Sequence, residues 1–149
     1  MAETLGSLCD KLTVVKLKQF HTEDSMSIQS LAKQEKQLQS EINNFIHAAI
    51  KGQIPHEQLT FAPNKVYKKE GNSIPDIKGN IGEVFTHLAK VNCDLWHEQE
   101  KVYDFEKVPV QEKNLIVKKL ALLNLERNQC INKIDKEFQE LIQQKSKSF

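Results

Sequence analysis

Histidine and carboxylate residues recur at three-residue spacing in two parts of the chain. Asp94, His97 and Glu100 are spaced by three, and His21 with Asp24 repeats the last two of these positions earlier in the sequence. On a helix this spacing places the side chains on roughly one side. Two such helices could supply imidazole and carboxylate ligands to a metal ion, as in di-iron bundles. The metal-site hypothesis therefore comprises His21, Asp24, Asp94, His97 and Glu100.

Other features of the same segments weigh against a metal ion. Lys18 occupies the position that corresponds to Asp94, and a cation there would oppose metal binding. The chain also contains no Glu–x–x–His motif of the kind that ferritin-like bundles use. A histidine beside Phe20 or Trp96 more often hydrogen-bonds a backbone group or a carboxylate near a helix end. We therefore expect no cofactor.

Polar side chains also interrupt the apolar pattern of the last expected helix. Arg127 occupies a core-type position, with Asn124 and Asn128 within one turn of it. If this helix runs antiparallel to the preceding one about a turn near Val108, Asn92 comes close to Asn124 and Arg127. A buried arginine needs a carboxylate or several carbonyl groups, because burying it unpaired is costly. The expected partners are Glu41, Asp94, Glu126 and Asp135.

Three interpretations of Arg127 stay open at this point. It could belong to a polar layer that fixes helix register, as a buried asparagine does in coiled coils. It could instead extend to the surface. It could also bind an anionic or sugar-like ligand, and the predicted ligand-binding residues are then Asn92, Trp96, His97, Asn124, Arg127 and Asn128.

Composition and charge narrow the function classes. The 149 residues include 21 basic and 20 acidic side chains, a net charge of +1, so we expect no nucleic-acid partner. The odd number of cysteines (Cys9, Cys93 and Cys130) and their wide spacing exclude a zinc ribbon or a thioredoxin-type site and are typical of a reducing cytoplasm. Charged residues near the start argue against a secretory signal, and no stretch reaches the roughly 20 apolar residues of a membrane span. The glycine-rich nucleotide-binding motifs and Gly–x–Ser–x–Gly are absent from the sequence as well.

Apolar residues at helical spacing predict four helices. We expect them over about 4–21, from Ser27 to near Gly52, from about 78–80 to 105–107, and from Pro109 to about 146. Between the second and third helices, residues 53–77 carry three prolines and no sustained periodicity. Because this segment also contains several large apolar residues, including Val66 and Tyr67, we expect an ordered crossover that packs on the helices.

An apolar stripe that ends in an aromatic–His pair occurs twice, followed each time by a helix that contains Glu–x–Asn. The corresponding residues are Leu12, Val15, Phe20, His21, Glu41 and Asn43 in one copy and Leu88, Val91, Trp96, His97, Glu126 and Asn128 in the other. The sequence thus predicts an all-α four-helix bundle of two pseudo-repeated hairpins, about 4–52 and about 78–146, in a single domain of 1–149. Hairpins exchanged between protomers are the alternative.

Several segments resemble the bacterial helical family catalogued as domain of unknown function 4254. They are Leu8-Cys9-Asp10-Lys11-Leu12-Thr13-Val14-Val15-Lys16-Leu17-Lys18 with Phe20-His21, Lys65-Val66-Tyr67-Lys68, Asn92–x–x–Leu95-Trp96-His97–x–Gln99-Glu100, and Leu123-Asn124–x–Glu126-Arg127-Asn128 with Ile131–x–x–Ile134-Asp135. The resemblance implies a helical cytoplasmic protein in the setting of surface-polysaccharide or glycosyltransferase functions. It brings no activity and no ligand.

These observations favour a non-enzymatic accessory or interaction module. Its expected partner is another protein or a second copy of the chain, without membrane insertion. The alternative is a ligand- or metal-dependent enzyme that uses His21, Asp94, His97, Glu100 and Arg127.

Overall fold

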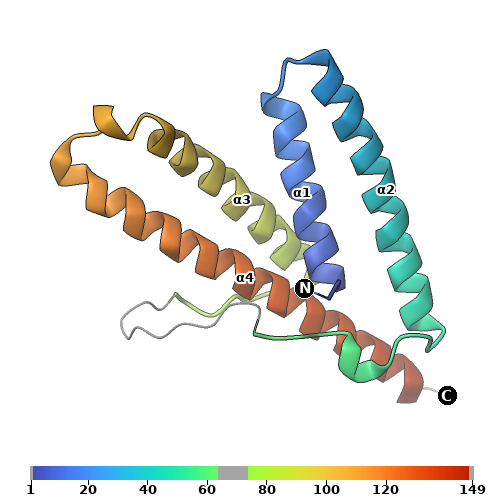
Figure 1. The fold of residues 1–149 in the computed structure, drawn as a ribbon. Helices are drawn as coiled ribbons and strands as arrows, with labels where there is room; N and C mark the ends of the chain where they lie inside the picture. Colours follow the sequence, from blue (N-terminus) through green and yellow to red (C-terminus); the bar gives the residue numbers. More distant parts are fainter. Residues whose placement is uncertain (1, 64–73, 148–149) are drawn as a thin grey trace.

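The computed structural model describes residues 2–63 and 74–147, and the regular structure within this part is helical throughout. The elements are α1 (Leu5–His21), α2 (Ser25–Ile50), the short η1 (His56–Gln58), α3 (Ile81–Tyr103), the short η2 (Phe105–Lys107) and α4 (Val110–Lys147). They form two antiparallel hairpins, α1–α2 and α3–α4, whose axes diverge from a shared base (Figure 1). The prediction of an all-α four-helix bundle is confirmed. None of the helices in the described part is long and apolar enough to span a lipid bilayer.

Helix starts are set by capping side chains. Thr4 caps α1 through a reciprocal pair of hydrogen bonds with Ser7, and Asn80 caps α3 by accepting from the Glu83 amide. The second helix, expected from Ser27, begins at Ser25 instead, because Asp24 is its cap and the Asp24 carboxylate accepts from the Ser27 amide at 2.9 Å. A carboxylate at this position also complements the positive end of the helix dipole.

Helix ends agree with the expectations with one exception. Gly52 lies just beyond α2 with a φ of +73°, a left-handed conformation that glycine adopts without strain. The third helix ends at Tyr103, earlier than predicted, and η2 then forms the turn into α4. Pro109 directly precedes α4, and its carbonyl accepts from the Glu112 amide at 2.9 Å.

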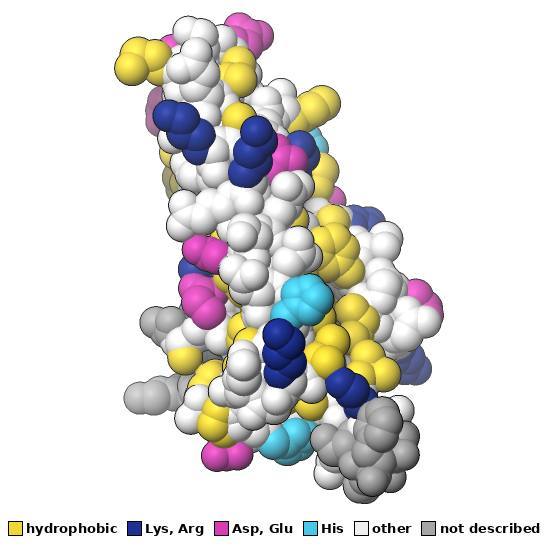
Figure 2. Space-filling view, turned by 90° about the vertical axis from the view of Figure 1, so that its right-hand side faces the viewer, with side chains coloured by type: hydrophobic (Ala, Val, Ile, Leu, Met, Phe, Trp, Pro, Cys, Tyr) yellow, Lys and Arg dark blue, Asp and Glu magenta, His cyan; other side chains and the backbone are white. Residues whose placement is uncertain are grey.

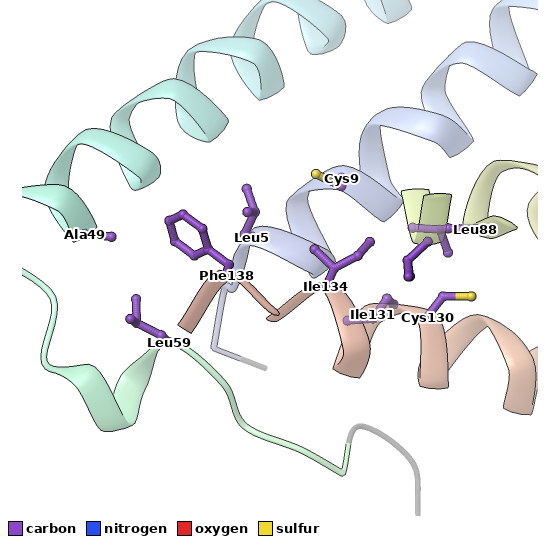
Figure 3. Packing of buried hydrophobic residues seen from close by; sticks show 10 residues of the cluster. Leu5, Cys9, Ala49, Leu59, Leu88, Cys130, Ile131, Ile134 and Phe138 are labelled. Carbon is purple, nitrogen blue, oxygen red and sulfur yellow. The ribbon is translucent and has the colours of Figure 1, made fainter. Parts of the chain in front are cut away.

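The crossover between the hairpins is anchored where it is described. It contains η1, and the next residue, Leu59, is fully buried. Leu59 packs into the core from the side opposite α1 (Figure 3). This contact holds the proline-rich segment against the helices. Val66 and Tyr67, which we expected to pack on the helices, lie outside the described residues.

The hydrophobic core lies at the shared base, where the start of α1, the end of α2, the start of α3 and the second half of α4 converge (Figures 1 and 3). Its centre includes Leu88, Cys130 and Ile134, which are fully buried. Phe138 of α4 meets Phe45 of α2 with ring centroids 6.2 Å apart. On the face that has α2 in front, further hydrophobic side chains gather along the lower half of that helix (Figure 2). Burial of this apolar surface is the main favourable term in holding the two hairpins together.

The start of α1 docks closely on α4. The Gly6 amide donates to Asp135 Oδ1 at 2.7 Å, and Asp135 is completely buried. A Cβ at Gly6 would lie 2.6 Å from the carbonyl oxygen of Ile131, so this approach of the two helices requires glycine. The buried carboxylate therefore acts as a cap for the α1 terminus that is supplied by another helix.

The pseudo-repeat remains a prediction, and its two copies have different surroundings. Phe20 is 84% exposed at the end of α1, whereas Trp96 is half-buried within α3. The Glu–x–Asn residues of α2, Glu41 and Asn43, are likewise exposed, whereas their counterparts in α4 are half-buried.

Asp135 predicts a specific dependence of stability on pH. Burial raises its pKa from the ordinary value of 3.8 to about 6, against the opposing effect of the Gly6 amide. Between these two values the native state binds more protons than the unfolded chain, so the free energy of unfolding falls as pH rises through this window. We expect Asp135→Asn, which does not titrate, to gain about 2–3 kcal/mol relative to wild type between pH 4 and pH 7.

Urea unfolding of both proteins at several pH values in this range measures the difference. Asp94→Asn is the matched control, because Asp94 is half-exposed on α3 and pairs with Lys90. A stability difference between Asp135→Asn and wild type that stays constant across this range would contradict the account.

Candidate functional site

A buried polar layer links three of the four helices. Arg127 of α4 donates from Nε to Asp10 Oδ1 at 2.9 Å and from Nη2 to Asp10 Oδ2 at 2.6 Å. Asn92 of α3 donates to the same Asp10 Oδ1 at 2.9 Å and to Thr13 Oγ1 at 2.8 Å. Asp10 is nearly inaccessible, and the Arg127 side chain is 34% exposed. This bidentate geometry is the strongest form of arginine–carboxylate pairing.

Asp10 reaches this layer because of its place on α1. It lies within one turn of Leu8 and Cys9, whose side chains face the core, and two residues before Leu12. The hydroxyl of Thr13 donates to the Asp10 carbonyl at 2.7 Å. This bond orients Thr13 Oγ1 so that it can accept from Asn92. The layer therefore attaches the first hairpin to the second.

None of the four predicted partners of Arg127 is its actual partner. Asp94 pairs with Lys90 on its own helix at 2.8 Å, and Glu126 pairs with His87 of α3. Asp135 caps α1, and the exposed Glu41 accepts from Gln37 of its own helix at 3.0 Å. The four expected partners lie near Arg127 or at matching positions of the pseudo-repeat, whereas Asp10 is 117 residues away in the chain.

The predicted alignment of α3 with α4 is close to the observed one. Lys119 Nζ lies 2.8 Å from Glu98 Oε1, and the two residues are nearly equidistant from Val108. Glu98 is buried and also accepts from Lys101 at 3.0 Å; hydrogen bonds from the two lysines hold its pKa below the ordinary value despite the opposing effect of burial. Glu98 could not be recognised as buried from the sequence, because a carboxylate among lysines has the pattern of a solvated surface.

Four of the six predicted ligand-binding residues line one small hollow. Asn92, Trp96, Asn124 and Arg127 border a space of about 210 Å³ between α1, α3 and α4. A second hollow, of about 580 Å³ between α1 and α2, also reaches Arg127 and Asp10, together with Lys11 and Lys18. Arg127 is therefore accessible from two sides, although Asp10 already occupies two of its nitrogen atoms.

The other two predicted residues lie elsewhere. Asn128 donates to the Asn124 carbonyl at 2.8 Å, a bond within α4. His97 borders a different and wider hollow of about 880 Å³ between the end of α3 and the start of α4. The predicted set of six therefore does not form one site.

The metal-site residues do not assemble into a metal centre. His21 and His97 come together, with ring centroids 6.3 Å apart, and His21 stacks on Trp96 at 4.5 Å. The carboxylates diverge, because Asp24 caps α2 and Asp94 pairs with Lys90. Within residues 2–63 and 74–147, no three His, Cys, Asp or Glu side chains are grouped closely enough to hold a metal ion. The two histidines instead form an aromatic contact between α1 and α3 beside Trp96.

Two of the three thiols are unsuited to nucleophilic chemistry. Burial raises the pKa of Cys9 to about 11 and that of Cys130 to about 12, and nearby carboxylates add to both shifts. The thiolate is the reactive form of cysteine, so these two side chains are inert packing residues.

The chain was compared with family models, with curated proteins and with solved structures, and none of the three comparisons finds a match.

The polar layer predicts a large difference in the free energy of unfolding between a single and a double variant. Arg127→Met leaves the Asp10 carboxylate buried without its cation, and we expect a loss of roughly 3 kcal/mol in the free energy of unfolding. The double variant Asp10→Asn/Arg127→Met removes both charges while residue 10 can still accept from Asn92. It should recover most of that loss.

Urea unfolding measures both effects, and Lys136→Met, which removes an exposed cation from the same helix, is the control. If Arg127→Met is as stable as this control, the pair does not hold the hairpins together.

Proposed function

We propose that this chain is a non-enzymatic helical interaction module whose binding surface is the outer side of the first half of α4. The observation that carries the proposal is the apolar character of this side. Val110 is 80% exposed and Val117 is 56% exposed. Ala121, one turn further along, is exposed as well.

The same stretch of α4 already buries another face. Ile116 and Leu123 point into the hairpin and are buried, while Val110, Val117 and Ala121 lie roughly on the opposite side of the helix. A helix that is apolar on two sides is typical of a segment covered on both. Exposed apolar groups of this size, gathered on one helix, favour a protein-binding surface over an ordinary solvated one.

The polar layer has a structural part in this proposal. Asp10 and Arg127 are paired with each other, so neither charge is free to act on a substrate. The layer also fixes the α3–α4 hairpin on α1, so that the outer side of α4 keeps a defined position relative to the first hairpin. The resemblance noted in the sequence would put such an accessory module in a bacterial surface-polysaccharide pathway of the cytoplasm.

A small-ligand site is the second candidate. It is favoured by the convergence of Asn92, Trp96, Asn124 and Arg127 on one hollow. Its volume of about 210 Å³ is below the range of roughly 300–1,000 Å³ that is usual for ligand pockets, so it has room for one sugar ring or one anionic group.

Thermal unfolding with sugar phosphates and nucleotide sugars tests the second candidate. A ligand that enters this hollow should raise the melting temperature of the wild type by several degrees. Asn124→Ala, which removes a side chain from the lining, should abolish the rise, and Gln143→Ala on the exposed end of α4 should keep it. If no compound of these classes shifts the wild type, the candidate fails.

The proposed binding surface predicts the effect of a charge placed upon it. Val110→Asp/Val117→Asp should reduce capture of the partner at least about tenfold, because each carboxylate would have to be desolvated in the interface. Ala32→Asp/Gln39→Asp is the matched control, with two exposed positions at the same seven-residue spacing on α2.

Affinity capture compares the wild type with the two double variants. Each tagged protein is captured from cells that also produce the untagged chain, and the bound proteins are quantified by mass spectrometry. Circular dichroism checks that all three are folded. Equal capture by all three proteins would contradict the proposed surface.

A further inference from the structure

The apolar positions on the outer side of α4 follow the spacing of a coiled-coil seam. Val110, Asn114, Val117 and Ala121 are separated by steps of four, three and four residues, and all four are exposed. These are d and a positions of a heptad repeat, with asparagine at one a position.

The flanking charges distinguish the two ways in which copies of this seam could pair. Gln111 and Lys118 occupy the e positions, and Lys113 and Leu120 occupy the g positions. In a parallel pair, Lys113 of one helix would meet Lys118 of the other, which places two like charges together. In an antiparallel pair, Lys118 faces Gln111 and Lys113 faces Leu120, so no like charges meet.

The antiparallel arrangement also determines which seam residues meet. Because a positions face d positions in this arrangement, Ala121 of one copy meets Val110 of the other. Asn114 then meets Val117, and the symmetry axis passes between residues 115 and 116. The seam therefore avoids contact between like charges in one orientation and not in the other, although Asn114 then lies against an apolar side chain.

We propose that the partner of this surface is a second copy of the chain, paired in antiparallel through Val110, Asn114, Val117 and Ala121 of α4. The inference rests on the proposed function and names its partner. From Val110 to Ala121 the seam spans roughly 17 Å, so we expect a small interface and a reversible dimer rather than an obligate pair.

Disulfide cross-linking of the full chain reports the orientation. In the antiparallel dimer residue 110 lies against residue 121 of the other copy, while two residues 110 lie far apart. An equimolar mixture of Val110→Cys and Ala121→Cys proteins should therefore cross-link under mild oxidation, and each protein alone should not. Oxidised wild type controls for the native thiols, since Cys93 is half-buried. Cross-linking by each variant alone would show a parallel pair and overturn the inference.

Sedimentation from roughly 10 μM to roughly 1 mM reports the association itself. Gln111→Glu places a carboxylate against Lys118 of the other copy, and we expect it to tighten the dimer severalfold. Gln143→Glu, on the exposed end of α4, should leave it unchanged. A wild type that stays monomeric over this range overturns the homodimer, whereas capture of a different protein that Val110→Asp/Val117→Asp abolishes would still support the proposed function.

Discussion

The ion pair between Asp10 and Arg127 is the contact on which the arrangement of the two hairpins depends. Hydrophobic burial at the base brings the hairpins together, but apolar contacts have little directional preference. The bidentate pair, extended by Asn92 and Thr13, specifies how α1 lies across α3 and α4. Breaking one side of it leaves a charge in a water-poor site, so the penalty for a wrong arrangement is high.

Asp135 complements this layer further along α4. It receives the start of α1, where Gly6 allows the backbones to approach closely. One face of α4 therefore holds the first hairpin through two buried carboxylate contacts, and another face packs against α3. The outer side of the first half of α4 contributes to neither contact, and its valines are left exposed. Because the other faces of this long helix are already covered within the chain, the exposed outer side is the one available to a partner.

Local features were predictable from the sequence because they depend on neighbouring residues. Helical periodicity and caps such as Asn80 place the helices to within a few residues, and hairpin geometry follows from the short turns. The error at Ser27 is also local, since Asp24 is a competing cap three residues away. The partner of Arg127 was not predictable in this way, because it depends on how one hairpin packs on the other. Trp96 and Asn124 border the same hollow as Arg127, whereas His97 borders another one, because it lies one residue further around the helix.

The most direct test of the central claim is amide hydrogen exchange in α4 as a function of protein concentration. In the proposed function, α4 has an inner side that packs within the chain and an outer side that binds another molecule. This arrangement predicts that slower exchange at high concentration is confined to peptides covering residues 110–121, while the buried second half of α4 is unchanged. Protection that appears instead on α2, or no dependence on concentration and on added partner anywhere in α4, would contradict the account.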